Sequence, residues 1–125
     1  MKRLTFLTIA ILLLAISVFS FAQNPTTAIS NTLKTGNTSA LSEYFASSLD
    51  LTLLDEEDTY NKAQARTLIN NFFKENTAQG FSIKHQGSAD NDAKYIIGIL
   101  NTSSGKFRTY LVIREGKIHE ISIEE

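Results

Sequence analysis

The sequence predicts an α+β domain in which helices pack on one face of a curved antiparallel sheet. Two observations carry this prediction. Apolar residues recur with a helical period of about 3.6 before Gly80 and with a strand period of about two after it. The connections between the later strands are short, which makes consecutive strands antiparallel neighbours. Helices gathered before an antiparallel sheet are typical of the α+β class.

Two short helices are predicted first. Asn24 and Pro25 are a favourable N-cap and first helical residue, and Gly36 is a favourable residue for the end of this helix. A second helix is predicted from about Ser39. Its apolar residues follow at helical spacing, namely Leu41, Tyr44, Phe45 and Leu49.

A strand and a longer helix are predicted next. Residues 49–54 alternate well enough for a strand, and the acidic run 55–58 is expected to end it as a solvated turn. Asn61 is the predicted N-cap of the third helix, with Gln64 completing a capping box. Residues 65, 68, 69, 72 and 73 then form one wide apolar face. The predicted order is therefore helix, helix, strand, helix and four strands.

The four last strands are predicted over residues 81–87, 94–102, 106–114 and 117–124. A two-residue turn at Glu115 and Gly116 places Arg114 opposite Lys117, so Val112 is expected opposite His119. Simple alternation then gives one face that we expect to be concave and covered by the helices. That face carries Tyr95, Ile97, Ile99, Arg108, Tyr110, Val112, His119, Ile121 and Ile123.

The N-terminus has the pattern of a secretion signal. Lys2 and Arg3 precede an apolar run, and small residues at Ser20 and Ala22 suit signal peptidase cleavage between Ala22 and Gln23. An uncleaved membrane anchor is the competing interpretation. We expect residues 1–22 to be removed and residues 23–125 to form a single domain. This predicts export by the general secretory route to the periplasm or the extracellular space.

Composition excludes several classes of protein. The chain has no cysteine, so it is not a disulfide scaffold. Its 12 basic side chains less Lys2 and Arg3 leave 10 against 13 acidic ones, a net charge of −3. A weakly acidic domain is not expected to bind nucleic acid or, after signal cleavage, an anionic membrane.

Six stretches resemble a family of small secreted Bacteroidota proteins of unknown function. They read LKTGN, LSEYF, AQARTLINNFF, FSIKHQG, KYIIGIL and KFRTYLVI, within residues 33–113. The element order also resembles the cone-shaped fold of nuclear transport factor 2 and the ketosteroid isomerases. This resemblance implies export and a curved sheet that wraps a long helix around a pocket. It implies no particular chemistry, because this fold carries both enzymes and binding proteins.

The candidate catalytic residues are His85, Tyr110 and His119. His85 shares the apolar side of its strand with Phe81 and Ile83, so we expect a hydrogen-bonded residue in a filled core. The alternative is a cavity in which the two imidazoles transfer protons near neutral pH. Isomerase-type chemistry needs an inward-facing carboxylate. Glu120, however, is expected on the face opposite Tyr110.

The candidate ligand-binding residues are Tyr95, Arg108, Tyr110 and His119. Arg108 could clamp a carboxylate, or it could lay its stem on the sheet with its head in water. Two histidines without further ligand spacing do not predict a metal site, and no cofactor is expected.

The leading functional interpretation is a non-enzymatic exported domain. It would bind a small ligand or a protein partner through the cone pocket or a sheet face, with a homodimer through the sheet as one form of this. The first alternative is a small enzyme of proton-transfer or hydration chemistry in the pocket. The second is a structural or accessory protein of the cell envelope.

Overall fold

The computed structural model describes residues 25–125. The predicted signal segment, the cleavage site at Ala22 and Gln23, and the N-cap residue Asn24 lie outside these residues. The elements in chain order are α2 (Pro25–Thr35), α3 (Thr38–Ser42), β1 (Phe45–Leu53), β2 (Glu56–Asn61), α4 (Lys62–Glu75), β3 (Ala78–Ser88), β4 (Lys94–Thr102), β5 (Gly105–Arg114) and β6 (Lys117–Glu124).

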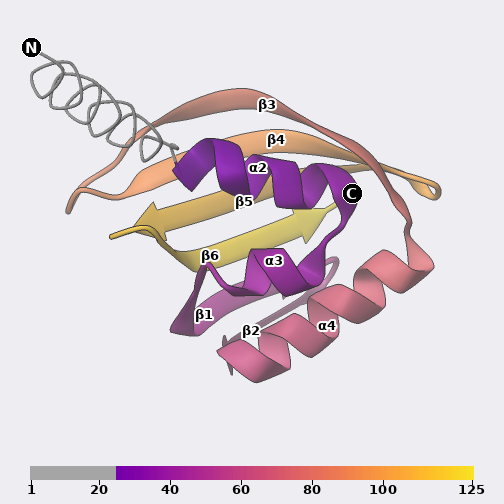
Figure 1. Cartoon of the computed structure of the whole chain (residues 1–125), viewed down its shortest axis with the longest axis horizontal. Helices are drawn as coiled ribbons and strands as arrows, with labels where there is room; N and C mark the ends of the chain where they lie inside the picture. Colours follow the sequence, from indigo (N-terminus) through magenta and orange to yellow (C-terminus); the bar gives the residue numbers. More distant parts are fainter. Residues whose placement is uncertain (1–24) are drawn as a thin grey trace, which may run out of the picture.

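Residues 25–125 form two layers, in which α2, α3 and α4 lie on one face of a curved, unclosed six-stranded sheet (Figure 1). The strand order is β2-β1-β6-β5-β4-β3. All neighbouring strands are antiparallel except β1 and β6, which are parallel. The predicted α+β class, with its helices on one face, is confirmed.

Local sequence signals place the end of α2 and the start of α4 where they were predicted. Gly36 ends α2 with a φ of 68°, a conformation that glycine adopts without strain. At the start of α4, the Gln64 amide donates to Asn61 Oδ1 at 2.8 Å, and the Asn61 amide donates to Gln64 Oε1 at 3.2 Å. This reciprocal capping box satisfies two backbone donors that the first helical turn leaves unpaired.

The region between α3 and α4 differs from the prediction. α3 ends at Ser42, and Phe45 and Leu49 belong to β1 rather than to a continued helix. Pairing of β1 with both β2 and β6 outweighs the helical spacing of these residues. The acidic run, predicted as a turn, begins β2 at Glu56, and the turn itself lies at Leu54 and Asp55. β2 is an exposed edge strand, and charge on such an edge discourages pairing with other chains.

Apolar side chains fill the space between the helices and the sheet. Ile29 and Leu33 of α2 and Ile69 of α4 are fully buried. They meet a cluster of sheet residues, namely Phe45, Leu49, Leu51, Phe81, Ile96, Leu100, Phe107, Leu111, Ile113, Ile118, Ile121 and Ile123. Burying each such side chain stabilises the fold by about 1.5–3 kcal/mol. The interior of this cone is therefore a packed core.

A β-bulge in β6 reverses the predicted choice of sheet face. Val112 pairs with Glu120, whereas Ile113 pairs with Ile118, so His119 is an extra residue. The expectation that Val112 lies opposite His119 is wrong. The bulge lets Ile118 and Ile121 point to the same face, with Leu111 and Ile113 of β5, and the helices cover that face. The helices therefore cover the face opposite to the one predicted. The face that was predicted to be covered is open, and Ile121 and Ile123 do not belong to it.

A second bulge changes the position of His85. Ile83 pairs with Gly98 and His85 with Ile97, so Lys84 is the extra residue. His85 therefore lies on the open face and is exposed, and the expectation of a core histidine is wrong.

Candidate functional site

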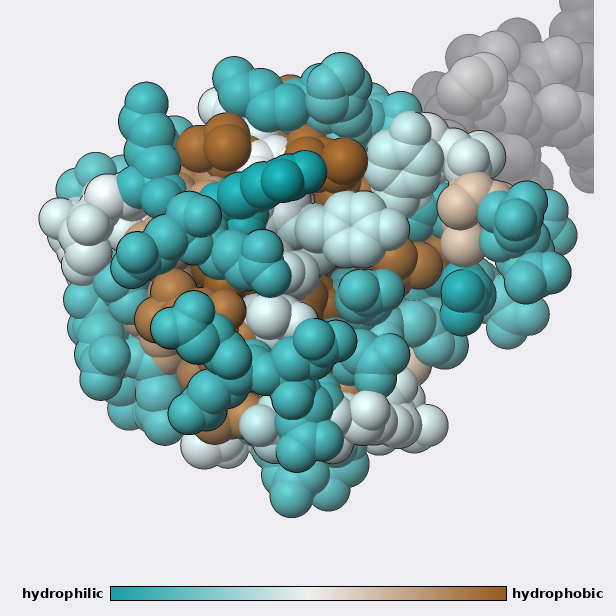
Figure 2. Space-filling view, turned by 180° about the vertical axis from the view of Figure 1, so that it is seen from behind, coloured by the Kyte–Doolittle hydropathy of each residue, from teal (hydrophilic) through white to brown (hydrophobic). Residues whose placement is uncertain are grey.

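The uncovered face of the sheet carries a strip of apolar side chains. Directly paired residues in a sheet point to the same side, so one row across the strands runs His85, Ile97, Tyr110 and Ser122. We call the central residues the apolar strip, which consists of Tyr95, Ile97, Ile99, Tyr110 and Val112. Four of them are half-buried and Val112 is 9% exposed, although no helix covers them. Figure 2 shows this face, with hydrophobic and aromatic groups visible between hydrophilic side chains.

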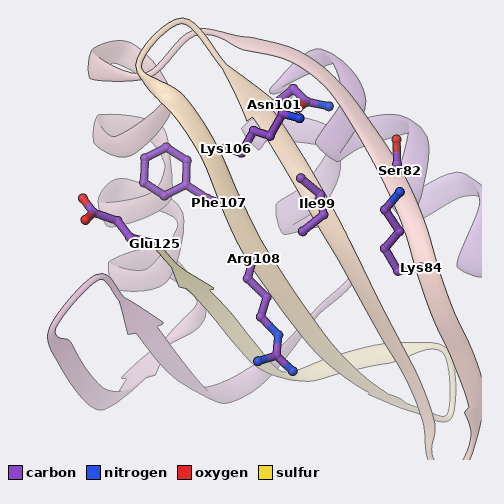
Figure 3. Close-up of a pocket in the computed structure, with 8 residues that line it drawn as sticks. All are labelled: Ser82, Lys84, Ile99, Asn101, Lys106, Phe107, Arg108 and Glu125. Atoms are coloured by element: carbon purple, nitrogen blue, oxygen red, sulfur yellow. The ribbon is translucent and has the colours of Figure 1, made fainter.

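A hollow of about 310 Å³ lies at one end of the strip, and we call it the basic hollow. Three cationic side chains line it, Lys84 from β3 and Lys106 and Arg108 from β5. Ile99 projects between Arg108 and Lys84, so the charges surround an apolar floor (Figure 3). Ser82, Asn101, Phe107 and Glu125 complete the lining.

The three cations of the basic hollow have no protein partner. Within residues 25–125, no ion pair or hydrogen bond joins the side chain of Lys84, Lys106 or Arg108 to another residue. Glu125 supplies the only acidic side chain in the lining, which also contains three basic side chains. Positive charge gathered in a concavity raises the local concentration of anions. A planar guanidinium can bind carboxylate or phosphate with two parallel hydrogen bonds.

A second hollow of about 290 Å³, the mixed hollow, lies on the same face at β1 and β6. It contains His119, Glu120, Asp50 and Arg114. Burial raises the pKa of Glu120, the negative charges of Asp50 and Glu57 raise it further, and Arg114 lowers it. Asp50 Oδ1 accepts a hydrogen bond of 2.7 Å from Thr59 Oγ1. The basic and mixed hollows thus give the sheet face a positive and a more negative end.

The structure separates the predicted catalytic residues. His119 lines the mixed hollow, whereas His85 lines neither hollow. Tyr110 lies in the strip between them, on β5, which neighbours the β6 strand of His119 and is separated from the β3 strand of His85 by β4. Glu120 pairs with Val112 and therefore shares the open face with Tyr110, which corrects the expectation that it lies on the opposite face. Of the predicted ligand-binding residues, Arg108 lines the basic hollow and Tyr95 belongs to the strip.

Two further kinds of feature are absent from the described residues. Residues 25–125 contain no group of three or more histidine, cysteine, aspartate or glutamate side chains that could hold a metal ion. Over the same residues, no helix has the length and apolar character needed to cross a membrane.

Comparison with known proteins identifies the family. Residues 26–124 match the family described as "Domain of unknown function (DUF4783)". The chain belongs to this family. A DUF4783 family protein from Bacteroides uniformis ATCC 8492 is 28% identical, with a TM-score of 0.76 over 82% of this chain and 97% of that one. One from Bacteroides ovatus ATCC 8483 is 27% identical, with a TM-score of 0.73 over 78% and 92%. The predicted resemblance to a Bacteroidota family of unknown function is confirmed.

More distant structures show the fold of the DUF4783 domain. An NTF2-like protein of unknown function from Cytophaga hutchinsonii ATCC 33406 is 9% identical, with a TM-score of 0.58 over 79% of this chain and 84% of that one. This likeness confirms the predicted NTF2-like fold. The comparison with curated proteins found no match.

Two lysines of the DUF4783 basic hollow were missed by the sequence prediction. Lys106 is adjacent to the turn before β5, where a lysine usually indicates only a solvated strand end. Lys84 reaches the hollow because the bulge places it there. The available signal was the alternation in residues 81–87, in which a charged residue and a histidine follow two apolar positions. In a regular strand, His85 would point to the same face as Phe81 and Ile83, and burying its polar imidazole there would cost free energy. A bulge avoids this cost because it turns His85 to the other face.

Proposed function

We propose that this DUF4783 domain is a non-enzymatic, exported binding domain that holds a small anionic molecule in the basic hollow. The observation that carries the proposal is the set of three unpaired cations around Ile99. Their charge favours an anion, and the apolar floor favours a ligand that also has a nonpolar part.

The arrangement of titratable groups supports binding rather than catalysis. Acid–base catalysis needs its groups within hydrogen-bond reach of one substrate, in a site that limits water. His85 and His119 lie on β3 and β6, with β4 and β5 between them, and the space under the helices is filled. An open hollow without a nucleophile and base in contact suits reversible capture. The predicted signal segment at residues 1–22 supports a role outside the cytoplasm.

The proposal can be tested by titrating ¹⁵N-labelled protein with butyrate and with inorganic phosphate while recording amide chemical shifts. We expect shifts centred on Lys84, Ile99 and Arg108, with a Kd on the order of 1 mM for such small ions in an open site. Replacing Arg108 by Gln should weaken binding about tenfold or more, since a charge-assisted hydrogen bond contributes ~1.5–3 kcal/mol.

The matched control is Lys74→Gln, which removes an exposed cation from the last turn of α4 on the other layer. Equal loss of affinity in both variants would attribute binding to net charge alone and refute the hollow as the site. Native mass spectrometry of protein purified from its own host tests export as well. An N-terminus other than Gln23 would refute the cleavage site.

A further inference from the structure

We infer that the ligand is a straight-chain carboxylate whose head occupies the basic hollow and whose tail lies along the apolar strip. This inference rests on the proposed function and adds the ligand's chemistry and its direction on the sheet. Ile99 belongs both to the basic hollow and to the apolar strip. A ligand whose head lies beside Arg108 therefore has apolar surface immediately next to it.

The strip continues from Ile99 in a straight line along β4. Side chains on one face of a strand repeat every second residue, so Ile97 and Tyr95 follow Ile99 at steps of about 6.7 Å. On β5, Tyr110 lies opposite Ile97 and Val112 opposite Tyr95. The two rows make a path about 13 Å long. An extended alkyl chain of medium length fits such a path, whereas a compact anion such as phosphate would leave it uncovered.

The far end of the strip is polar, which fixes the direction of the ligand. The Tyr95 ring lies over Gly87, where the ring hydroxyl is 2.8 Å from the position a Cβ would occupy. Beyond Val112 the same row reaches Glu120 and Asp50. Negative charge there repels an anionic head, and the cations of the basic hollow attract it. Charge at the two ends therefore favours a single orientation, with the tail running along β4 and β5 toward Tyr95 and Val112.

The test measures Kd for the series butyrate, hexanoate, octanoate and decanoate, each below its aggregation concentration. The protein is the processed product of the full-length gene. Full burial of a methylene strengthens binding about fourfold, and burial of one side of the chain on an open face should give about twofold. We expect Ile97→Ser to flatten this dependence on chain length while butyrate binding stays unchanged. Tyr110→Ser serves as a second variant, and Arg108→Gln should weaken the whole series by the same factor.

Two controls make the result specific. Leu54→Ser removes the large apolar side chain that is 41% exposed at the β1–β2 turn, away from the strip, and should change nothing. Decylamine has the same kind of tail with a cationic head and should bind at least tenfold more weakly than decanoate. If decylamine bound as tightly as decanoate, the inference would be overturned, because the tail would then bind without any contribution from the anionic head.

Other outcomes separate this inference from the proposed function. If butyrate binds in the basic hollow and affinity does not rise with chain length, the tail site is refuted while the anion site stands. If neither a carboxylate nor inorganic phosphate binds in the basic hollow, the proposed function fails as well. Sedimentation velocity tests the competing occupant of the strip, a second copy of this chain. A dimer that excludes decanoate and is dissociated by Ile97→Ser would overturn the inference.

Discussion

Gly98 is expected to be the least replaceable glycine of the sheet, because its missing side chain is what lets β3 and β4 pack under the helices. A Cβ built at Gly98 would lie 2.4 Å from Phe81 Cζ and 2.7 Å from the Ser82 carbonyl oxygen. Nonbonded carbon atoms pack at about 3.5–4.0 Å, so both neighbours would have to move by about 1 Å. Gly98 itself is buried, which leaves little room for such movement.

The cost of Gly98→Ala follows from these contacts. Forcing a methyl group into a packed core costs about 1–3 kcal/mol. The backbone at Gly98 is not left-handed, so alanine also restricts the unfolded chain and recovers about 0.4–1 kcal/mol. We therefore expect a net destabilisation of about 1–2 kcal/mol. For a domain of this size, each kcal/mol lowers Tm by about 4–8 °C.

Urea unfolding, with the slope m compared between variants, measures this difference. Gly80→Ala is the matched control on the neighbouring strand, since a Cβ there would meet nothing nearer than Asn101 Nδ2 at 3.9 Å. Phe81→Leu combined with Gly98→Ala should recover part of the loss, because the ring clash is relieved while the clash with Ser82 remains. The reasoning is refuted if Gly98→Ala is as stable as Gly80→Ala.

Two further substitutions test single polar groups. The hydroxyl of Thr109 is buried without a hydrogen-bond partner, so Thr109→Val should raise the free energy of unfolding by about 1 kcal/mol. Thr102→Val should lower it instead, since Thr102 Oγ1 bonds to Gly105 and Ser104, and equal effects would contradict the argument. Glu120→Gln should stabilise the fold at neutral pH by a screened amount, on the order of 0.5 kcal/mol. The raised pKa means that ionised Glu120 opposes folding, and this cost disappears as the pH falls through its folded-state pKa. This explanation would be refuted if the wild type and Glu120→Gln still differed in the free energy of unfolding well below pH 4.5, the ordinary pKa of a glutamate side chain.

The parts of the fold that the sequence predicts are those with a local cause. The capping box at Asn61 and the Glu115–Gly116 turn depend on neighbouring residues, and both form as expected. β2 was missed because its only half-buried residue is Tyr60, so it shows no apolar alternation. The second helix was extended too far because the spacing of Leu41, Tyr44 and Phe45 suits a helix. Pairing with β6, distant in sequence, decides that segment instead.

The candidate site depends on two residues that simple alternation cannot place. In β6, Ile118, Ile121 and Ile123 are separated by three and then two positions, and only an extra residue at His119 lets all three enter the core. In β3, the extra residue Lys84 turns His85 to the open face while Lys84 itself lines the basic hollow. Burial of the apolar residues requires the first bulge and the exposure of His85 requires the second. The two bulges therefore decide which charged side chains lie on the open face. A prediction of the site must locate these bulges first.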